Sequence, residues 1–425
     1  MWEKVIQIFK IRDLRNKIIF VLAMLAIFQL MAVIPIPGVD TARLKAFFEG
    51  NQIFGLLDIF SGGALSNLSV VMLGVAPYIT GSIIMQLMTM IFPQLKELYQ
   101  ESGAQGRAKF NQYSRLLTVP LAIVQSVGLL TLLQNQQIIA KLGMFDFARD
   151  ILIITAGTVF LMWLGELITE KGIGNGISLI IFAGIVAQLP ATIQQVLFSY
   201  DPSQIPTYLV FLAIAVVVIA GVVFVSEAQR NIPVSYAKRI RGGRLYGGVS
   251  SYLPLRVNQA GVIPIIFAIS ILLFPGVIAQ FAGALNVSWL STVAGFVTKL
   301  FSNQFFYGSL YFILVVLFTY FYTAVTFDPK TISSNLQKMG GFVPGIRPGS
   351  STANFLYYIL NRVLLIGALF LGVIAVLPSA VGGATGISSF QFLVGGTSLL
   401  IVVSVILETV RQIDSQLQMR DYETF

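Results

Sequence analysis

Long apolar runs recur along the whole chain, and they constrain the fold more than any other feature of the sequence. A helix of roughly 20 apolar residues is long enough to cross the hydrocarbon core of a bilayer. Hydrophobic residues make up 56% of the 425 residues, and charged residues only 11%. Soluble domains carry about 25% charged residues, so most of this chain must face lipid or other apolar segments. The sequence therefore predicts an all-α polytopic membrane protein.

Ten such runs are separated by short polar segments. They lie at residues 18–34, 70–91, 116–133, 151–168, 175–189, 208–225, 257–274, 306–325, 355–377 and 392–407. Ten spans divide the chain into an N-terminal half, 1–200, and a C-terminal half, 201–425, joined through a loop at 190–206. Because each half has an odd number of spans, we expect the halves to be inserted in opposite orientations, as in many transporters.

The net charge of +9 follows the predicted topology. When the connecting segments are assigned alternately to the two sides of the membrane, 22 of the 27 Lys and Arg residues fall on one side. The other side holds only Arg43, Lys45, Lys141, Arg149 and Lys299. Lys and Arg accumulate in cytoplasmic loops, so we expect both termini in the cytoplasm.

The chain contains neither cysteine nor histidine. Disulfides, thiol chemistry and the hydrolytic mechanisms that need histidine are therefore excluded. Ion-coupled carriers commonly place charges within the membrane, whereas Glu166, Glu227 and Glu408 approach spans only near their cytoplasmic ends. We expect no catalytic residue, no metal site and no cofactor, and a protein that is not an enzyme.

Two polar interruptions break the apolar pattern. The first is FSGGALSN at 60–67, and the second is VNQAGVIP at 257–264. Irregular backbone cannot face lipid because its polar groups would lack partners, so both segments must be buried in protein or line a cavity. Pore-lining or moving elements are one interpretation. Ordinary helix kinks are the other, because glycine and proline are common in membrane helices.

Several strings of residues point to one family. They are IPIPG at 34–38, FSGGALS at 60–66, PYI at 77–79 with QL at 86–87, FLMWLGE at 160–166 with GIGNGIS at 172–178, YAKR at 236–239, LPL at 253–255 with VN at 257–258, AGVIP at 260–264, FVPGIRPG at 342–349 and GGTSLLI at 395–401. Together they resemble the SecY family, the channel-forming subunits of the bacterial Sec protein translocase. The resemblance implies a clamshell-like channel of ten helices with a re-entrant plug, which opens sideways between spans two and seven.

This resemblance also implies a function, partners and a location. Unfolded preproteins would cross the channel, and hydrophobic segments would leave it laterally into the bilayer. The implied partners are SecE, SecG, the ATPase SecA, the ribosome with its RNA, signal sequences, preproteins and membrane lipids, in the bacterial cytoplasmic membrane. A secondary transporter of a small solute is the alternative that inverted halves and broken helices suit equally well. An intramembrane protease would need histidine or membrane-embedded acids, which the sequence lacks.

Four groups of site residues are implied by their places in the matched strings. The pore ring comprises Val75, Ile79, Ile177, Ile181, Ile266 and Ile401. The plug, about residues 54–67, includes Asp58, Ile59, Phe60, Ser61, Gly62, Gly63, Ala64, Leu65 and Ser66. The lateral gate contains Gln86 and Asn258. Docking of the motor or ribosome would use Lys238, Arg239, Arg241, Arg244 and Arg347, in cytoplasmic loops 226–256 and 326–354.

Each group also has a plainer interpretation. A ring of branched aliphatic side chains would dewet and exclude ions, but most membrane isoleucines simply pack helices or face lipid. The amides could make ordinary helix-packing hydrogen bonds, the plug could be a fixed re-entrant turn, and the basic loops could serve topology alone.

Overall fold

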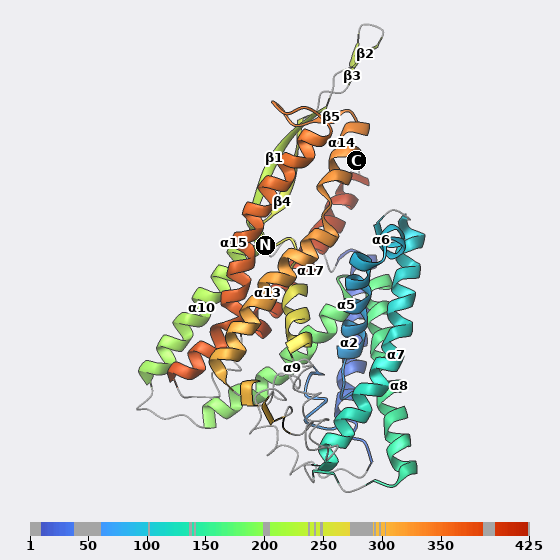
Figure 1. The fold of residues 1–425 in the computed structure, drawn as a ribbon, viewed down its shortest axis with the longest axis vertical. Helices are drawn as coiled ribbons and strands as arrows, with labels where there is room; N and C mark the ends of the chain where they lie inside the picture. Colours follow the sequence, from blue (N-terminus) through green and yellow to red (C-terminus); the bar gives the residue numbers. More distant parts are fainter. Residues whose placement is uncertain are drawn as a thin grey trace.

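The computed structural model describes residues 10–37, 61–100, 103–135, 138–139, 142–198, 205–236, 239–241, 244–246, 250–272, 292, 295–296, 299–301, 303–385 and 396–423. Most of these residues are helical (Figure 1). The labelled helices are α2 (Arg12–Val33), α5 (Ala76–Ile91), α6 (Pro93–Gln100), α7 (Gly103–Asn135), α8 (Met144–Lys171), α9 (Gly176–Phe198), α10 (Ile205–Glu227), α13 (Gln304–Thr326), α14 (Pro329–Lys338), α15 (Ser350–Thr385) and α17 (Gly396–Glu423).

Every predicted apolar run contains a helix within its described part. Among the described residues, five helices are long and apolar enough to cross a membrane, or six if α5 and α6 are one span broken by a bend of 116°. The segments Gly176–Ala191, Leu212–Glu227 and Ile263–Leu272 are apolar helices of shorter length. Residues 273–274 and 392–395 of the predicted runs lie outside the described residues.

Several boundaries differ from the sequence-based expectation, including that of the run at 257–274, which becomes helical only at Ile263. The expected loop at 190–206 is helical as far as Phe198, because α9 continues through Pro190, and neighbouring helices can satisfy a backbone that proline disturbs. The run expected to begin at residue 70 becomes helical only at Ala76, after a series of turns. Helix α17 extends well past residue 407 because its polar continuation is rich in Glu, Gln and Arg, which are good helix formers.

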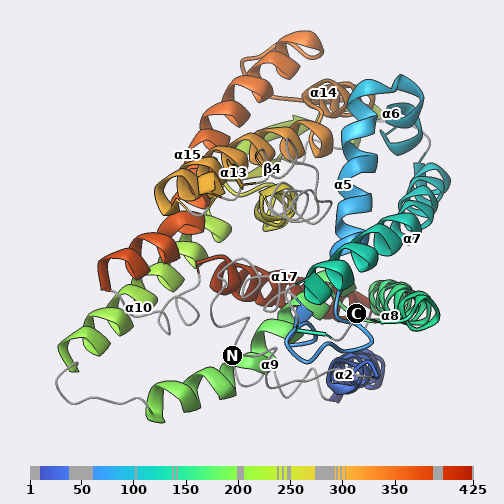
Figure 2. The same ribbon diagram turned by 60° about the horizontal axis from the view of Figure 1, so that its bottom comes forward.

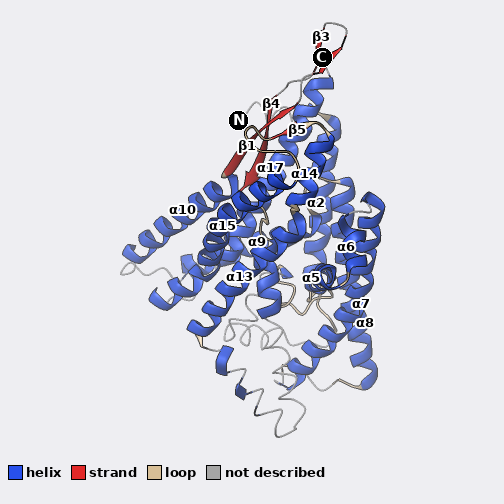
Figure 3. Cartoon of the chain, turned by 45° about the horizontal axis from the view of Figure 1, so that its top comes forward, coloured by secondary structure: helices blue, strands red, loops and turns tan. Residues whose placement is uncertain are grey.

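Two small sheets accompany the helices and were not foreseen in the all-α prediction. Strand β1 (Gln229–Tyr236) lies between β4 (Ser250–Arg256) and β5 (Gly341–Phe342), antiparallel to both. Strands β2 (Arg239–Arg241) and β3 (Arg244–Tyr246) form a separate antiparallel pair. Alternation of apolar and polar residues explains the placement of β1, since Ile232 and Val234 are buried and Pro233 between them is exposed. All five strands lie at one end of the molecule (Figure 3).

The long helices surround the centre of the molecule. Helices α2, α5, α7 and α8 gather on one side, and α10, α13 and α15 on the other (Figures 1 and 2). Helix α9 packs against α2, α8 and α17, and α17 in turn packs against α10 and α15. The largest buried apolar cluster draws residues from nearly all of these helices, so the core lies where the two groups meet.

An irregular segment at 61–75 is held inside this bundle. Its backbone pairs with the chain after α2, because Ile36 N–H donates to Leu68 O at 2.8 Å and Val70 N–H donates to Ile34 O at 3.0 Å. Helix α8 admits the segment at Gly157, where a Cβ atom would overlap the carbonyl group of Val70. This burial agrees with the expectation that the polar interruption cannot face lipid.

Candidate functional site

The six residues of the expected pore ring belong to one apolar cluster. Val75, Ile181, Ile266 and Ile401 are buried members of it, and Ile79 and Ile177 pack against it while partly exposed. These residues come from the N-terminus of α5, from α9, from the helix Ile263–Leu272 and from α17. The structure therefore brings together side chains that are more than 300 positions apart in the sequence.

A cavity of about 590 Å³ adjoins this cluster. Its lining includes Ile79, Ile177, Ile181 and Ile266, and also Gln86 of the expected lateral gate. Most of the remaining lining consists of aromatic, polar and charged side chains, which come mainly from α5, α7 and α8, with others from α6, α9 and the helix Ile263–Leu272. The cavity therefore has branched aliphatic side chains and a polar wall within the same space.

The turn between α8 and α9 positions Ile177 and Ile181. Asn175 caps α9 because its Oδ1 accepts hydrogen bonds from the backbone N–H of Ile177 at 3.1 Å and of Ser178 at 3.3 Å. Gly176 lies so close to the carbonyl group of Gly165 that a Cβ atom would not fit. The Thr169 hydroxyl completes the junction, donating to Gly165 O at 2.9 Å and accepting from Gly176 N–H at 2.8 Å.

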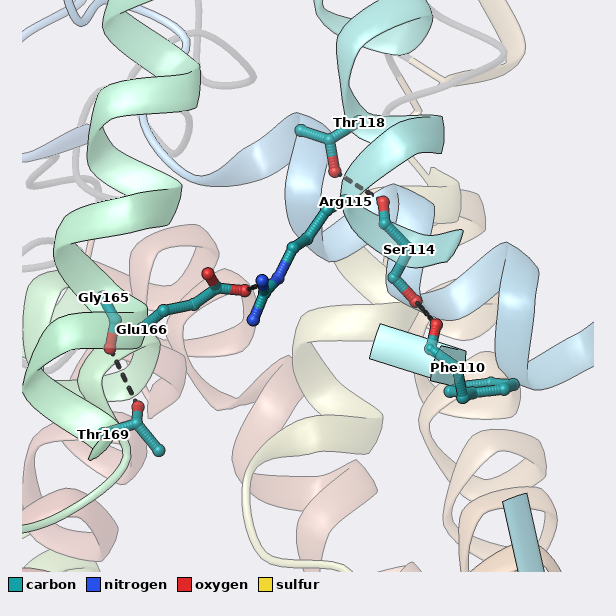
Figure 4. Close-up of polar contacts among 7 residues, drawn as sticks. All are labelled: Phe110, Ser114, Arg115, Thr118, Gly165, Glu166 and Thr169. Atoms are coloured by element: carbon teal, nitrogen blue, oxygen red, sulfur yellow. Dashed lines mark hydrogen bonds and ion pairs between the residues drawn. The ribbon is translucent and has the colours of Figure 1, made fainter. Parts of the chain in front are cut away.

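The polar wall of the cavity contains an ion pair between α7 and α8. Figure 4 shows the Arg115 side chain on α7 extending toward Glu166 on α8, where its Nε contacts a carboxylate oxygen. The Arg115 side chain is 47% exposed and that of Glu166 is 21% exposed. Two hydroxyls near Arg115 are already used on α7 itself. Ser114 donates to the carbonyl of Phe110, and Thr118 donates to the carbonyl of Ser114, so neither hydroxyl donates to Glu166.

Part of the expected plug lies between α2 and α9. Ala64 and Leu65 are buried, and the Leu65 N–H donates to Ser61 Oγ at 3.0 Å. Gly62 and Gly63 have φ of 72° and 81°, which is a conformation that glycine adopts without strain. A Cβ atom on Gly62 would lie 2.7 Å from the Cα of Gly184 on α9. The Ser66 hydroxyl donates to Gly63 O at 3.0 Å. Asp58, Ile59 and Phe60 lie outside the described residues.

The two amides of the expected lateral gate are both buried at their oxygens. Within the part of the chain that the structure describes, neither Gln86 Oε1 nor Asn258 Oδ1 accepts a hydrogen bond. The two amides are therefore not hydrogen-bonded to each other in this conformation. A buried amide oxygen that lacks a hydrogen bond is energetically costly.

The expected docking residues fall in two loops at the same end of the molecule. Arg239, Arg241 and Arg244 lie in the β2–β3 hairpin, and Lys238 lies outside the described residues. Arg347 is exposed on a turn whose backbone is held by two bonds, from Thr352 Oγ1 to Arg347 O at 2.9 Å and from Ile346 N–H to Val343 O at 3.0 Å. The β2–β3 hairpin, β5 and α14 lie together at the top of Figure 1.

Sequence reasoning did not single out two residues that line the cavity, Arg115 and Trp163, of which Trp163 is 53% exposed. Glu166 was recognised only as a charge near the end of a span. The available signal was the spacing of Trp163, Glu166 and Glu170, since residues three and four apart share one face of a helix.

The bundle of apolar helices around a partly aliphatic cavity defines a polytopic helical membrane protein of the channel or carrier class. Residues 69–410 match the family model described as SecY. The protein translocase subunit SecY of Corynebacterium glutamicum is 45% identical over 443 residues, which cover 99% of this chain and 98% of that protein. The chain belongs to the SecY family.

Two solved structures share the fold at low sequence identity. One is a SecY protein whose plug domain is described as stabilising the closed state of the translocation channel and maintaining a membrane seal. It has a TM-score of 0.64 and 20% identity, and the match covers 93% of this chain and 90% of that chain. The other is Sec61 in the canine ribosome–channel complex from the endoplasmic reticulum, with a TM-score of 0.63, 19% identity and the same two coverages.

Proposed function

We propose that this chain is the protein-conducting channel of a bacterial Sec translocase and that it is not itself an enzyme. Unfolded preproteins pass through it, and hydrophobic segments leave it sideways into the bilayer. The observation that carries the proposal is the shared cluster of Val75, Ile79, Ile177, Ile181, Ile266 and Ile401 beside a cavity, in a chain 45% identical to a protein translocase subunit over nearly its whole length. Branched aliphatic side chains offer no hydrogen bonds, so a ring of them resists ions but yields to a passing chain of any sequence.

The plug and the gate are parts of the same proposal. Residues 54–67 seal the channel from the external side and move away when a client enters. The sealing role described for the plug domain of the solved SecY protein supports this assignment, as does the burial of Ala64 and Leu65. Gln86 and Asn258 belong to the gate through which hydrophobic segments leave, and their unpaired oxygens are consistent with a contact that rearranges.

We place both termini and the loops 226–256 and 326–354 in the cytoplasm, in a clamshell of ten spans with halves 1–200 and 201–425. Arg347 and the β2–β3 hairpin form the docking face, supported by their position at one end of the molecule (Figure 1). The ribosome is one partner, as in the canine ribosome–channel complex of similar fold. SecA, SecE and SecG are the others that the family membership suggests.

A cross-linking experiment separates this function from solute transport. A photo-cross-linking amino acid is placed at Ile79 or Ile266, which line the cavity, and as a control at Ile366, which is 63% exposed on α15. A secretory precursor stalled during transport is expected to be labelled from the two cavity positions and not from Ile366. A carrier of small solutes would give no label from any position, and that result would contradict the proposal.

A further inference from the structure

One face of α8 presents an aromatic ring and two carboxylates to the cavity. Trp163, Glu166 and Glu170 all line it, and they are three and four residues apart, so they form one stripe about 10 Å long. Glu170 and Trp163 are exposed, and Glu166 is partly exposed. We refer to Trp163, Glu166 and Glu170 as the α8 stripe.

The charge of the cavity wall is opposite to that of the chain. The whole chain carries a net charge of +9. Among the described lining residues, Glu166 and Glu170 are the acidic residues and Arg115 is the basic one, which leaves the lining with one excess negative charge. A cation that approaches this basic protein therefore finds a locally acidic wall inside the cavity, where the field of the carboxylates is focused.

The contact between Arg115 and Glu166 is not needed to hold α7 against α8. Further along these helices, Leu130 and Leu133 of α7 are buried with Ile154 of α8 in a separate apolar cluster. An ion pair as exposed as Arg115–Glu166 adds little to stability, because water screens it. An arriving cation can therefore replace Arg115 on Glu166 at little cost.

We propose that the α8 stripe binds the Lys or Arg side chains that precede an apolar segment of a client polypeptide, an inference that rests on the proposed function. Glu166 and Glu170 accept the charge, and Trp163 offers its ring face to the same cation. The apolar segment that follows then lies against Ile79, Ile177 and Ile266 in the same lining. This binding holds the basic end of the client at the wall while its apolar part reaches the ring.

Two peptides that differ only in charge test the inference. Each carries a photo-cross-linking residue in an apolar segment, preceded in one peptide by two Lys and in the other by two Gln. Labelling is measured on the full chain in nanodiscs. The Lys peptide is expected to label the unaltered protein about fivefold more strongly than the Gln peptide, from two partly screened ion pairs and one cation–π contact. In the double variant Glu166→Gln, Glu170→Gln, labelling by the Lys peptide is expected to fall to the level of the Gln peptide. Labelling by the Gln peptide is expected to stay unchanged.

A matched control is available at another ion pair. Glu227→Gln breaks the contact between Glu227 of α10 and Arg411 of α17, whose side chains are 49% and 31% exposed and do not line the cavity. We expect this variant to keep the fivefold ratio. The exchanged pair Arg115→Glu with Glu166→Arg restores a helix–helix ion pair but puts a cation beside Trp163, so the ratio is expected to stay lost.

Three results would overturn the inference. The first is that the Lys peptide still labels the Glu166→Gln, Glu170→Gln variant more strongly than the Gln peptide. The second is that labelling by both peptides falls equally in that variant. The third is that the exchanged pair recovers the preference for the Lys peptide, which would show that the Arg115–Glu166 contact is purely structural. Transport of complete precursors is measured separately in vesicles. Failure of the unaltered protein to transport complete precursors would refute the proposed function. The ratio of labelling by the two peptides reports on the α8 stripe alone.

Discussion

At the scale of single residues, close approach of backbones positions the centre of the molecule. Gly157 lets the irregular segment at Val70 lie directly on α8, and Gly176 lets α9 begin against Gly165. Small residues at such contacts allow membrane helices to pack tightly, since lipid supplies no hydrophobic force between helices. These glycines therefore set where the segment at 61–75 and the start of α9 lie.

Gly157→Ala is expected to destabilise the protein. Alanine is the better helix former by about 1 kcal/mol, but its Cβ would overlap the Val70 carbonyl, and overpacking of this kind costs about 1–3 kcal/mol. Gly221→Ala is the control, because a Cβ on that helical glycine would lie 3.5 Å from the Phe370 ring, an ordinary contact distance. Thermal unfolding followed by tryptophan fluorescence should show a lower midpoint for Gly157→Ala only. Equal midpoints in the two variants would show that α8 and Val70 separate easily.

At the scale of elements, the residues of the proposed ring come from short stretches of different helices that share one apolar cluster. Replacing Ile79, Ile181 and Ile401 together with Ser puts hydroxyls where the constriction should be dry, so water and ions can enter. Conductance of the resting channel in planar bilayers is expected to rise severalfold, and secretion to persist. Ile19→Ser and Ile366→Ser change exposed isoleucines on α2 and α15 and should leave conductance unaltered. A triple variant as tight as the unaltered protein would place the seal elsewhere.

The turn that carries Arg347 is a second element whose proposed role in docking can be tested. Arg347→Glu reverses a charge that projects from a turn held by Thr352 and Ile346. Losing a charge-assisted contact of about 1.5–3 kcal/mol would weaken motor binding about tenfold or more. Lys109→Glu reverses an exposed charge on α7 outside both loops and should have little effect. Binding of the motor to vesicles measures both variants, and equal affinities for Arg347→Glu and the unaltered protein would remove Arg347 from the docking face.

Elements were easier to predict than the contacts among them. Each of the ten predicted apolar runs contains a helix in the part of the chain that the structure describes, because crossing lipid demands a long apolar helix. The strands β1 and β4 were not predicted, since an eight-residue alternation such as that around Ile232 is weak beside the strong apolar signal of the spans. The residues of the expected ring could be proposed only through family strings, because an isoleucine at a constriction and one facing lipid are chemically identical. The Arg115–Glu166 contact was not found, because it depends on how α7 and α8 are rotated.

At the scale of the whole molecule, the C-terminal helix α17 contacts both α2, near the start of the chain, and the turn between α8 and α9. Leu417 is buried with Leu14 of α2 and Ile173 of the α8–α9 turn. Gln412 also reaches this turn, since its Oε1 accepts a hydrogen bond from Gly174 N–H at 2.7 Å. Because Ile177 follows the turn and Ile401 lies on α17 itself, this contact links the segments that carry two residues of the proposed ring from opposite halves of the chain. If the two halves separate between α5 and the helix Ile263–Leu272, the contact between α17 and the α8–α9 turn must keep the halves joined.

Gln412→Leu should loosen this contact without changing the packing elsewhere. Leucine is similar in size but accepts no hydrogen bond, so the buried Gly174 N–H loses its partner at a cost of about 1–3 kcal/mol. This cost corresponds to an increase of at least about fivefold in the equilibrium constant for local opening of the turn. Gln412→Glu is the matched control because it keeps an acceptor at the same place. Hydrogen exchange measured by mass spectrometry is expected to speed up at residues 172–176 in Gln412→Leu and to stay slow in Gln412→Glu, with β1 and β4 unchanged in both. If the two variants exchange alike at 172–176, the hydrogen bond does not hold the turn, and the apolar cluster of Leu14, Ile173 and Leu417 alone joins α17 to the N-terminal half.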